Sequence, residues 1–219
     1  MKKILLAMIL SALGLPLSFL ATGQVSSNNL DDKLLKAAES GDTAAVQELL
    51  QKGANIEARG NRGRTALISA VYGGNTAVLQ LLLEKGANIE ARDNDGNTAL
   101  LKAADAGKLE VVKFLLEKGA NVEAEAFHKT ALITAAIDGK TEVVKLLLEK
   151  GANIEAKAEN DKTALMWAAE EGQADIVKLL LQKGANIDAK SDRGATALQL
   201  AVSNGQTEVE KLLREKGAK

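Results

Sequence analysis

A Gly-Ala triplet that returns at a nearly constant interval is the strongest constraint on the fold of this chain. Gly-Ala-Asn begins at Gly53, Gly86, Gly119, Gly151 and Gly184, and Gly-Ala-Lys begins at Gly217, at steps of 33, 33, 32, 33 and 33 residues. A period of this length indicates supersecondary units that stack on their neighbours. The 219-residue chain is therefore built largely from one unit used again and again.

The central copy, residues 93–125, shows what one unit folds into. Thr98 is suited to begin a helix, because its hydroxyl can accept a hydrogen bond from a free N–H of the first turn. The apolar residues among 99–104 then share one face of a short helix, which Gly107 ends. A second helix follows with an apolar stripe over 111–116 and ends at the next Gly-Ala. Helices of this length are marginal alone in water, so stacking must stabilise them.

These units resemble ankyrin repeats. The family pattern is a turn with Asp and Gly, then Thr-Pro-Leu-His with a pair of alanines, then a Val/Leu-rich helix ending in Gly-Ala. The matching segments here are Thr65-Ala66-Leu67, Thr98-Ala99-Leu100, Thr130-Ala131-Leu132, Thr163-Ala164-Leu165 and Thr196-Ala197-Leu198. Alanine replaces the family proline each time, and its histidine position holds Ile68, Leu101, Ile133, Met166 or Gln199.

Five full matches and a degenerate first copy cover residues 31–219. The resemblance implies an all-α repeat solenoid, a stack of six pairs of antiparallel helices with β-turn fingers between them. The repeats are expected at about 30–59, 60–92, 93–125, 126–157, 158–190 and 191–219.

Polar substitutions at both ends of this array predict terminal caps. The first repeat has Lys33 and Glu48 where the second has Ala66 and Leu81, and the last has Glu210 and Arg214 where the fifth has Val177 and Leu181. Polar residues suit helix faces that no further repeat covers. We therefore expect one solenoid over 30–219 and no second domain.

The first 29 residues are expected to lie outside the solenoid. Lys2 and Lys3 precede an apolar run from Ile4 to Leu20, and Ala21-Thr22-Gly23 provides the small residues that a signal peptidase reads. The pattern predicts a signal peptide over 1–23, cleaved before Gln24, and a polar, disordered spacer over 24–29. The alternative is an uncleaved anchor, since an apolar run of 17 residues is at the short end for spanning a bilayer. We expect a periplasmic or secreted protein with no stable membrane anchor after cleavage.

The residue composition argues against catalysis. The chain has no cysteine, and its single histidine, His128, cannot build a nucleophilic triad or a four-ligand zinc site by itself. The stretch 93–96 (Asp-Asn-Asp-Gly) is better interpreted as a turn than as a calcium loop, because its glycine comes too early and Ala104 stands where the bidentate Glu belongs. The glycines end helices and form no phosphate loop. We expect no enzyme and no catalytic, cofactor-binding or metal-binding residue.

The charge balance argues against nucleic acid as a partner. The formal net charge is −1, and it becomes −3 once the two lysines of the predicted signal peptide are removed. A chain near neutrality has no general affinity for nucleic acid.

Residues that vary between repeats at finger tips and on the inner face of the first helix are the candidate binding residues, because ankyrin-family proteins use these positions for contacts. They are Asn61, Arg62, Tyr72, Asn94, Asp95, Lys102, Asp105, Phe127, Ile137, Trp167, Glu170, Asp192 and Arg193. Aromatic anchors on a polar concave surface are typical of interface hot spots.

The fourth repeat is one residue short, with Phe127-His128 where the third has Asp95-Gly96. We expect this turn to bring Phe127 to a finger tip, where it forms one apolar patch with Ile137 and Trp167. The alternative is that Ile137 and Trp167 fill gaps between helices.

The expected function is a monomeric, non-enzymatic, exported scaffold that binds a protein partner through its concave face and finger tips. It would act as an inhibitor or immunity-type partner of a secreted toxin or enzyme. The alternative is a secreted, host-directed effector that also acts by binding proteins.

Overall fold

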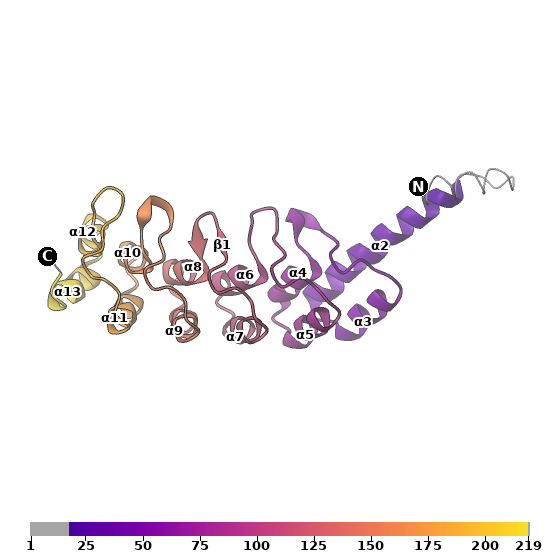
Figure 1. The fold of residues 1–219 in the computed structure, drawn as a ribbon, viewed down its shortest axis with the longest axis horizontal. Coiled ribbons are helices and arrows are strands. Elements are labelled where there is room, and N and C mark those ends of the chain that lie inside the picture. Colours follow the sequence, from indigo (N-terminus) through magenta and orange to yellow (C-terminus); the bar gives the residue numbers. More distant parts are fainter. Residues whose placement is uncertain (1–17, 219) are drawn as a thin grey trace.

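The computed structural model describes the backbone of residues 18–218 and the side chains of residues 29–218. It is a row of six helix pairs, shown in Figure 1. The pairs are α2 (Ser18–Ser40) with α3 (Thr43–Gln51), α4 (Ala66–Gly73) with α5 (Thr76–Glu84), α6 (Ala99–Asp105) with α7 (Leu109–Glu117), α8 (Ala131–Ile137) with α9 (Thr141–Glu149), α10 (Ala164–Glu170) with α11 (Ala174–Gln182), and α12 (Ala197–Ser203) with α13 (Thr207–Glu215). The predicted six-repeat solenoid is confirmed.

Each pair has an inner helix, which lies next to the loops that we call fingers, and an outer helix on the opposite edge of the row (Figure 1). Inner helices pack on inner helices of neighbouring repeats, and outer helices pack on outer helices. Small side chains permit this approach: Ala99, Ala103 and Ala104 of α6 are fully buried. Leu115 of α7 is also fully buried and fills the space between the two layers.

The inner helices of repeats two to six begin where the sequence predicts. The hydroxyl of Thr98 accepts a hydrogen bond from the N–H of Leu101 at 3.4 Å, and it is buried by the stack. Thr65, Thr130, Thr163 and Thr196 cap their helices in the same way. A hydroxyl acceptor at this position satisfies one of the free N–H groups of the first turn.

Five fingers connect successive repeats, and we number them after the repeat that they enter. They comprise residues 59–64 (finger 2), 92–97 (finger 3), 125–129 (finger 4), 157–162 (finger 5) and 190–195 (finger 6). Fingers 2 and 5 contain the short 3-10 helices η1 (Asn61–Gly63) and η2 (Glu159–Asp161). Finger 4 belongs to a β-hairpin in which β1 (Glu125–Ala126) pairs antiparallel with β2 (Lys129–Thr130), Glu125 opposite Thr130 and Ala126 opposite Lys129.

The N-terminal segment differs from the prediction in one respect. Helix α2 starts at Ser18 and projects from the end of the stack (Figure 1), so the backbone of residues 24–29 is helical and not a disordered spacer. The reason is that this segment continues, without a break, the helix that packs in the first repeat. Residues 1–17, which hold most of the predicted signal peptide, lie outside the described residues. Within residues 18–218, no helix is both long and apolar enough to cross a bilayer.

Candidate partner-binding surface

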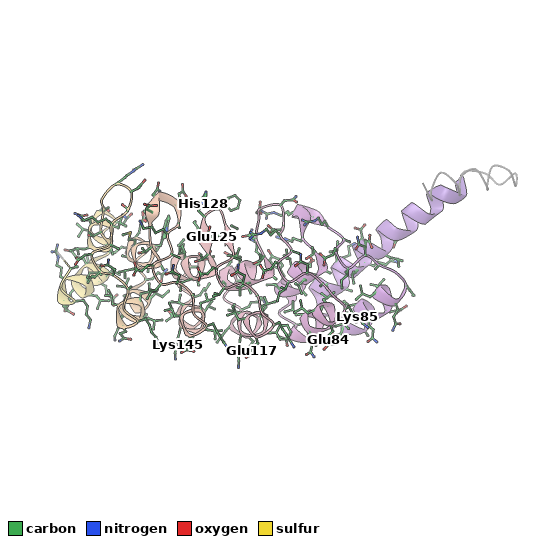
Figure 2. All side chains as sticks on the ribbon, in the orientation of Figure 1. Glu84, Lys85, Glu117, Glu125, His128 and Lys145 are labelled. Atoms are coloured by element: carbon green, nitrogen blue, oxygen red, sulfur yellow. The ribbon has the colours of Figure 1, made fainter. Side chains whose placement is uncertain are left out.

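The candidate surface consists of the fingers and the exposed side of the inner helices. Figure 2 shows Glu125 and His128 on finger 4 at one edge of the molecule, whereas Glu84, Glu117 and Lys145 of the outer helices lie at the opposite edge. All the candidate binding residues belong to the fingers or to inner helices. The structure therefore places the candidate residues along one side of the solenoid, on five successive repeats.

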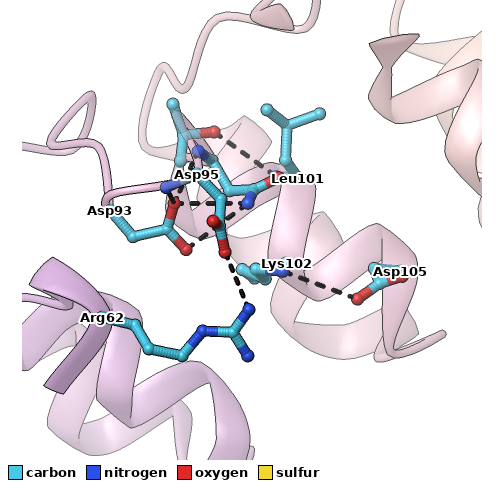
Figure 3. A network of polar contacts seen from close by, with 8 residues as sticks. Arg62, Asp93, Asp95, Leu101, Lys102 and Asp105 are labelled. Atoms are coloured by element: carbon cyan, nitrogen blue, oxygen red, sulfur yellow. Dashed lines mark hydrogen bonds and ion pairs between the residues drawn. The ribbon is translucent and has the colours of Figure 1, made fainter. Parts of the chain in front are cut away.

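Fingers 2 and 3 are joined through Arg62 and Asp95. The Arg62 Nη2 atom lies 3.0 Å from Oδ2 of Asp95 (Figure 3). The backbone N–H of Asn94 donates to the Arg62 carbonyl at 2.9 Å. The buried carboxylate of Asp93 orders finger 3 from within by accepting from the N–H groups of Asp95 and Asn97. Arg62 and Asp95 thus position each other and still leave polar atoms exposed at the tips.

Fingers 5 and 6 show a matching backbone contact. The N–H of Asp192 donates to the carbonyl of Asn160 at 3.0 Å, and Arg193 is exposed at the tip of finger 6. Asn61 is likewise exposed at the tip of finger 2. These tip residues are free to contact a partner without disturbing the helices.

Tyr72 lies in the last turn of α4 and is 36% exposed. The guanidinium carbon of Arg64 lies 4.3 Å from the centroid of its ring, which is a cation–π distance. One face of the Tyr72 ring is therefore covered by Arg64.

Phe127 is the most exposed large apolar side chain in the described part of the chain, at 69%. It occupies the two-residue turn between β1 and β2 together with His128, and the φ angles of the two residues are 49° and 59°. Both angles are in the left-handed region, which costs roughly 1–2 kcal/mol for each residue with a side chain. The prediction that Phe127 lies at a finger tip agrees with this geometry.

The fingers differ in how many residues of the turn have a positive φ, and hydrogen bonding inside the turn explains the difference. In finger 3 the Asp93 carboxylate, and in finger 6 the Ser191 hydroxyl, accept backbone N–H bonds inside the turn, and only a glycine in each has a positive φ. Finger 4 has Ala126 at that position, which offers no acceptor. Its shorter turn closes instead through two successive residues with positive φ, as in a type I′ hairpin. Fingers 2 and 5 also lack a side-chain acceptor at that position and likewise have two successive residues with positive φ, Arg62 with Gly63 and Asn160 with Asp161.

Trp167 and Ile137 do not share the exposure of Phe127. Both are half-buried and pack against the core, as the gap-filling alternative expected. The ammonium groups of Lys162 and Lys129 lie 4.2 Å and 5.1 Å from the Trp167 ring centroid. Of the three residues expected to form one apolar patch, only Phe127 is thus largely exposed, because lysines cover the tryptophan.

The carboxylate of Glu170 completes this cluster by pairing with the Lys162 ammonium at 2.5 Å. Both side chains are mostly buried, with exposures of 22% and 13%. The Trp167 Nε1 atom is buried and has no hydrogen-bond acceptor among the described residues. The cluster is a packed polar layer on the inner helices of repeats four and five, with an unused donor at its centre.

Acidic residues collect at the C-terminal ends of the inner helices, where the helix dipole disfavours negative charge by about 0.3–1 kcal/mol each. Asp105 ends α6, Asp138 caps α8, and Glu170 and Glu171 end α10. The outer helices show the opposite and favourable arrangement: Glu110, Glu142, Asp175 and Glu208 lie in their first turns, and Lys118, Lys150, Lys183 and Lys216 follow their last turns. The inner ends therefore hold carboxylates at some cost to stability.

The Asp105 carboxylate of repeat three acts on Asp138 of repeat four. Partial burial raises the pKa of the Asp138 carboxyl above its usual value, and the neighbouring Asp105 carboxylate raises it further, while Lys140 and Lys129 oppose the shift. Lys102 lies 3.9 Å from Asp105 and offsets its charge in part (Figure 3). A negative edge therefore runs along the inner helices of repeats three to five.

Several residues of this surface were not among the predicted ones. Arg64, Lys129 and Lys162 all stand directly before a helix-starting threonine, where other repeats have Asn97 or Ala195. The residue before the threonine varies from repeat to repeat, and this variation in the sequence could have marked Arg64, Lys129 and Lys162 as surface residues. Asp138 and Glu171 follow the inner helices by one residue, and Val202, 47% exposed, lies at the uncovered end of the last repeat. Within the described residues, no group of acidic or histidine side chains could hold a metal ion.

This architecture, a solenoid of stacked helix pairs that presents fingers and inner helices along one side, defines a repeat scaffold for protein interaction. The chain belongs to the ankyrin-repeat family: the family model of ankyrin repeats in three copies matches residues 34–126, 122–191 and 159–219.

Solved structures and curated relatives agree. An ankyrin repeat domain from Acinetobacter baumannii is 35% identical with a TM-score of 0.75, and the match covers 85% of this chain and 98% of that one. One chain of the complex between the predatory endopeptidase Bd0816 of Bdellovibrio bacteriovorus and immunity protein Bd3460 is 34% identical with a TM-score of 0.74, covering 84% and 97%. The ankyrin repeat protein RF_p14 of Rickettsia felis is 48% identical over 44 residues, which are 20% of this chain and 70% of that protein.

Proposed function

We propose that this chain is an exported scaffold that binds one protein partner along its fingers and inner helices and restrains that partner's activity, in the manner of an immunity protein. The observation that carries this proposal is the strained turn of finger 4, which exposes 69% of Phe127 on the side of the solenoid that also carries the negative edge of the inner helices. An exposed aromatic side chain beside polar groups has the composition of an interface hot spot.

Two further observations support the immunity-type role. The Lys2-Lys3 start and the apolar run to Leu20 are typical of an export signal. The likeness to one chain of an endopeptidase–immunity protein complex extends over 84% of this chain and 97% of that one. The partner would accordingly be an enzyme that the producing cell must restrain outside its cytoplasm.

A secreted effector directed at another cell is the second candidate, and the same export signal supports it. Cell fractionation separates the two. A protein retained in the periplasm together with its partner favours the immunity-type role, whereas a protein recovered from the culture medium favours the effector.

The deciding experiment purifies the partner with the tagged full-length protein from its native cells and identifies the N-terminus of the tagged protein by mass spectrometry. We expect a mature protein that begins at Gln24 and a partner enzyme whose turnover falls when the array is added at equal concentration. Asp105→Lys should weaken this inhibition, while the outer-helix variant Lys113→Glu should leave it unchanged. An intact Met1 together with unaltered partner turnover would contradict the proposal.

A further inference from the structure

Three features of finger 4 deserve a joint explanation: the apolar side chain at its tip, the β-hairpin that presents it, and the contacts with the neighbouring fingers. We propose, on the basis of the function proposed above, that finger 4 is an insertion element whose Phe127 ring enters an apolar pocket of the partner protein. Three sets of contacts carry this inference.

The first is the state of the ring itself. Tyr72 has a guanidinium on its ring and Trp167 has two ammonium groups nearby, so both rings are engaged within the protein. In the described part of the chain, no cation lies over Phe127, and 69% of its surface is exposed. A phenyl group forms no hydrogen bond, so a site that receives it must be apolar.

The second is the backbone that presents the ring. Phe127 and His128 have φ angles of 49° and 59°, a conformation in which type I′ turns prefer Asn and Gly. Fingers 2 and 5 hold the polar residues Arg62, Asn160 and Asp161 at similar angles, so among the described non-glycine residues with a positive φ, Phe127 is the one with an apolar side chain. Residues held in such unfavourable conformations cluster at sites that bind ligands or partners.

The third is the support of the finger. On one side, Nη1 of Arg92 donates to the Glu125 carbonyl at 2.6 Å. Arg59 forms the equivalent bond from finger 2 to the Arg92 carbonyl, also at 2.6 Å. Finger 4 has Glu125 in place of such an arginine, and among the described residues no hydrogen bond joins finger 4 to finger 5.

This combination presents a rigid base and a free tip. Ala126 is buried and paired with Lys129 across the hairpin, so the turn is anchored next to the core. A preformed turn loses little conformational entropy when it binds, which favours tight insertion.

The test replaces Phe127 with the photoreactive amino acid p-benzoylphenylalanine in the full chain, expressed in its native cells. We expect irradiation to give one covalent adduct, and mass spectrometry to place the bond on apolar residues that line a pocket of the partner. The same amino acid at Lys113 of the outer helix is the control and should give none. Absence of an adduct at 127, or adducts spread over polar surface residues, would overturn the insertion.

A parallel substitution at Asp105 keeps this inference separate from the proposed function. Adducts at residue 105 without adducts at residue 127 would show that a partner binds the inner helices and that finger 4 does not insert into it. Absence of adducts at both positions rejects the proposed function as well.

The strained turn supplies a second measurement that a structural role of Phe127 would not produce. Changing Phe127→Asn together with His128→Gly should raise the urea midpoint, because this pair suits a type I′ turn, and should weaken affinity for the captured partner at least about thirtyfold. His128→Gly alone should raise the midpoint and keep the affinity. Retained affinity in the double variant would overturn the inference.

Discussion

The carboxylate of Glu90 accepts a hydrogen bond from the backbone N–H of Asn121, 31 residues further along the chain, at 2.8 Å. The same bond recurs from repeat to repeat: Glu57 accepts from Asn88, Glu123 from Asn153, and Glu155 from Asn186, at 2.7 to 2.8 Å. Each glutamate therefore links its repeat to the next one at the base of the fingers. This row of bonds adds a polar contribution to the apolar stacking between repeats.

Glu90→Ala should lower the free energy of unfolding by about 1 kcal/mol, because it removes a charge-assisted hydrogen bond that is exposed to water. Urea unfolding followed by circular dichroism measures the loss. Glu117→Ala, at the end of an outer helix, is the matched control and should change stability by less than about 0.5 kcal/mol. Equal losses in the two variants would show that the row of bonds does not couple the repeats.

The position of a repeat in the stack should decide how much a buried leucine contributes. Leu115 of α7 and Leu213 of α13 are both fully buried, but the repeat of Leu115 has neighbours on two sides and that of Leu213 has one. Leu115→Ala should cost about 2–5 kcal/mol in urea unfolding. Leu213→Ala should cost less, because the last repeat can unfold before the rest. Equal losses would mean that the last repeat does not behave as a terminal cap.

Asp138→Asn should stabilise the fold at neutral pH. Since the pKa of Asp138 is raised in the folded state from the usual 3.8, its stabilising contribution is present below pH 3.8 and is lost as the pH rises through the folded value. Removing the charge at pH 7 relieves both the repulsion by Asp105 and the unfavourable helix dipole, so we expect a rise in Tm on the order of 1 °C. The gain should disappear near pH 3.

Glu142→Gln is the control for this effect, because Glu142 lies in the first turn of α9, where the dipole favours a negative charge. It should lower the Tm at pH 7. A lower Tm for Asp138→Asn as well would contradict the account of the acidic edge.

Trp167→Ala should lower the free energy of unfolding by about 1–3 kcal/mol, because the half-buried ring packs against the core under Lys129 and Lys162. Phe127→Ala is the comparison, since its ring is 69% exposed and its loss should leave the urea midpoint nearly unchanged. A wild-type midpoint for Trp167→Ala would show that the tryptophan is available to a partner after all.

The stack of helix pairs could be predicted because each helix carries its own local signals. A threonine that caps a helix, as Thr98 does, and a glycine that follows one, as Gly119 does with a φ of 87°, depend on a few neighbouring residues and leave a clear pattern in the sequence. The same signals recur in successive repeats, which makes the pattern easy to recognise. The expected disorder of residues 24–29 is not observed, because helix α2 is continuous from Ser18 and a polar stretch without glycine or proline did not stop it.

The candidate surface was harder to predict because it depends on contacts between repeats. The candidate list contained Trp167 but not the lysines that cover it, which come from the residues before Thr130 and Thr163. Lys129 and the Trp167 ring come close only because repeats four and five stack on each other. The exposure of Phe127, by contrast, could be predicted from one deleted residue in its turn, since a shorter turn leaves its side chains at the tip.

The most direct test of the account is hydrogen–deuterium exchange of the full-length array with and without the partner captured from its native cells. We expect slower exchange on binding in fingers 2 to 5 and in the last turns of α6, α8 and α10, with the largest change at finger 4 and no change in the outer helices α5, α7, α9 and α11. Protection confined to the outer helices, or to α2 and α3 at the N-terminal end, would contradict it.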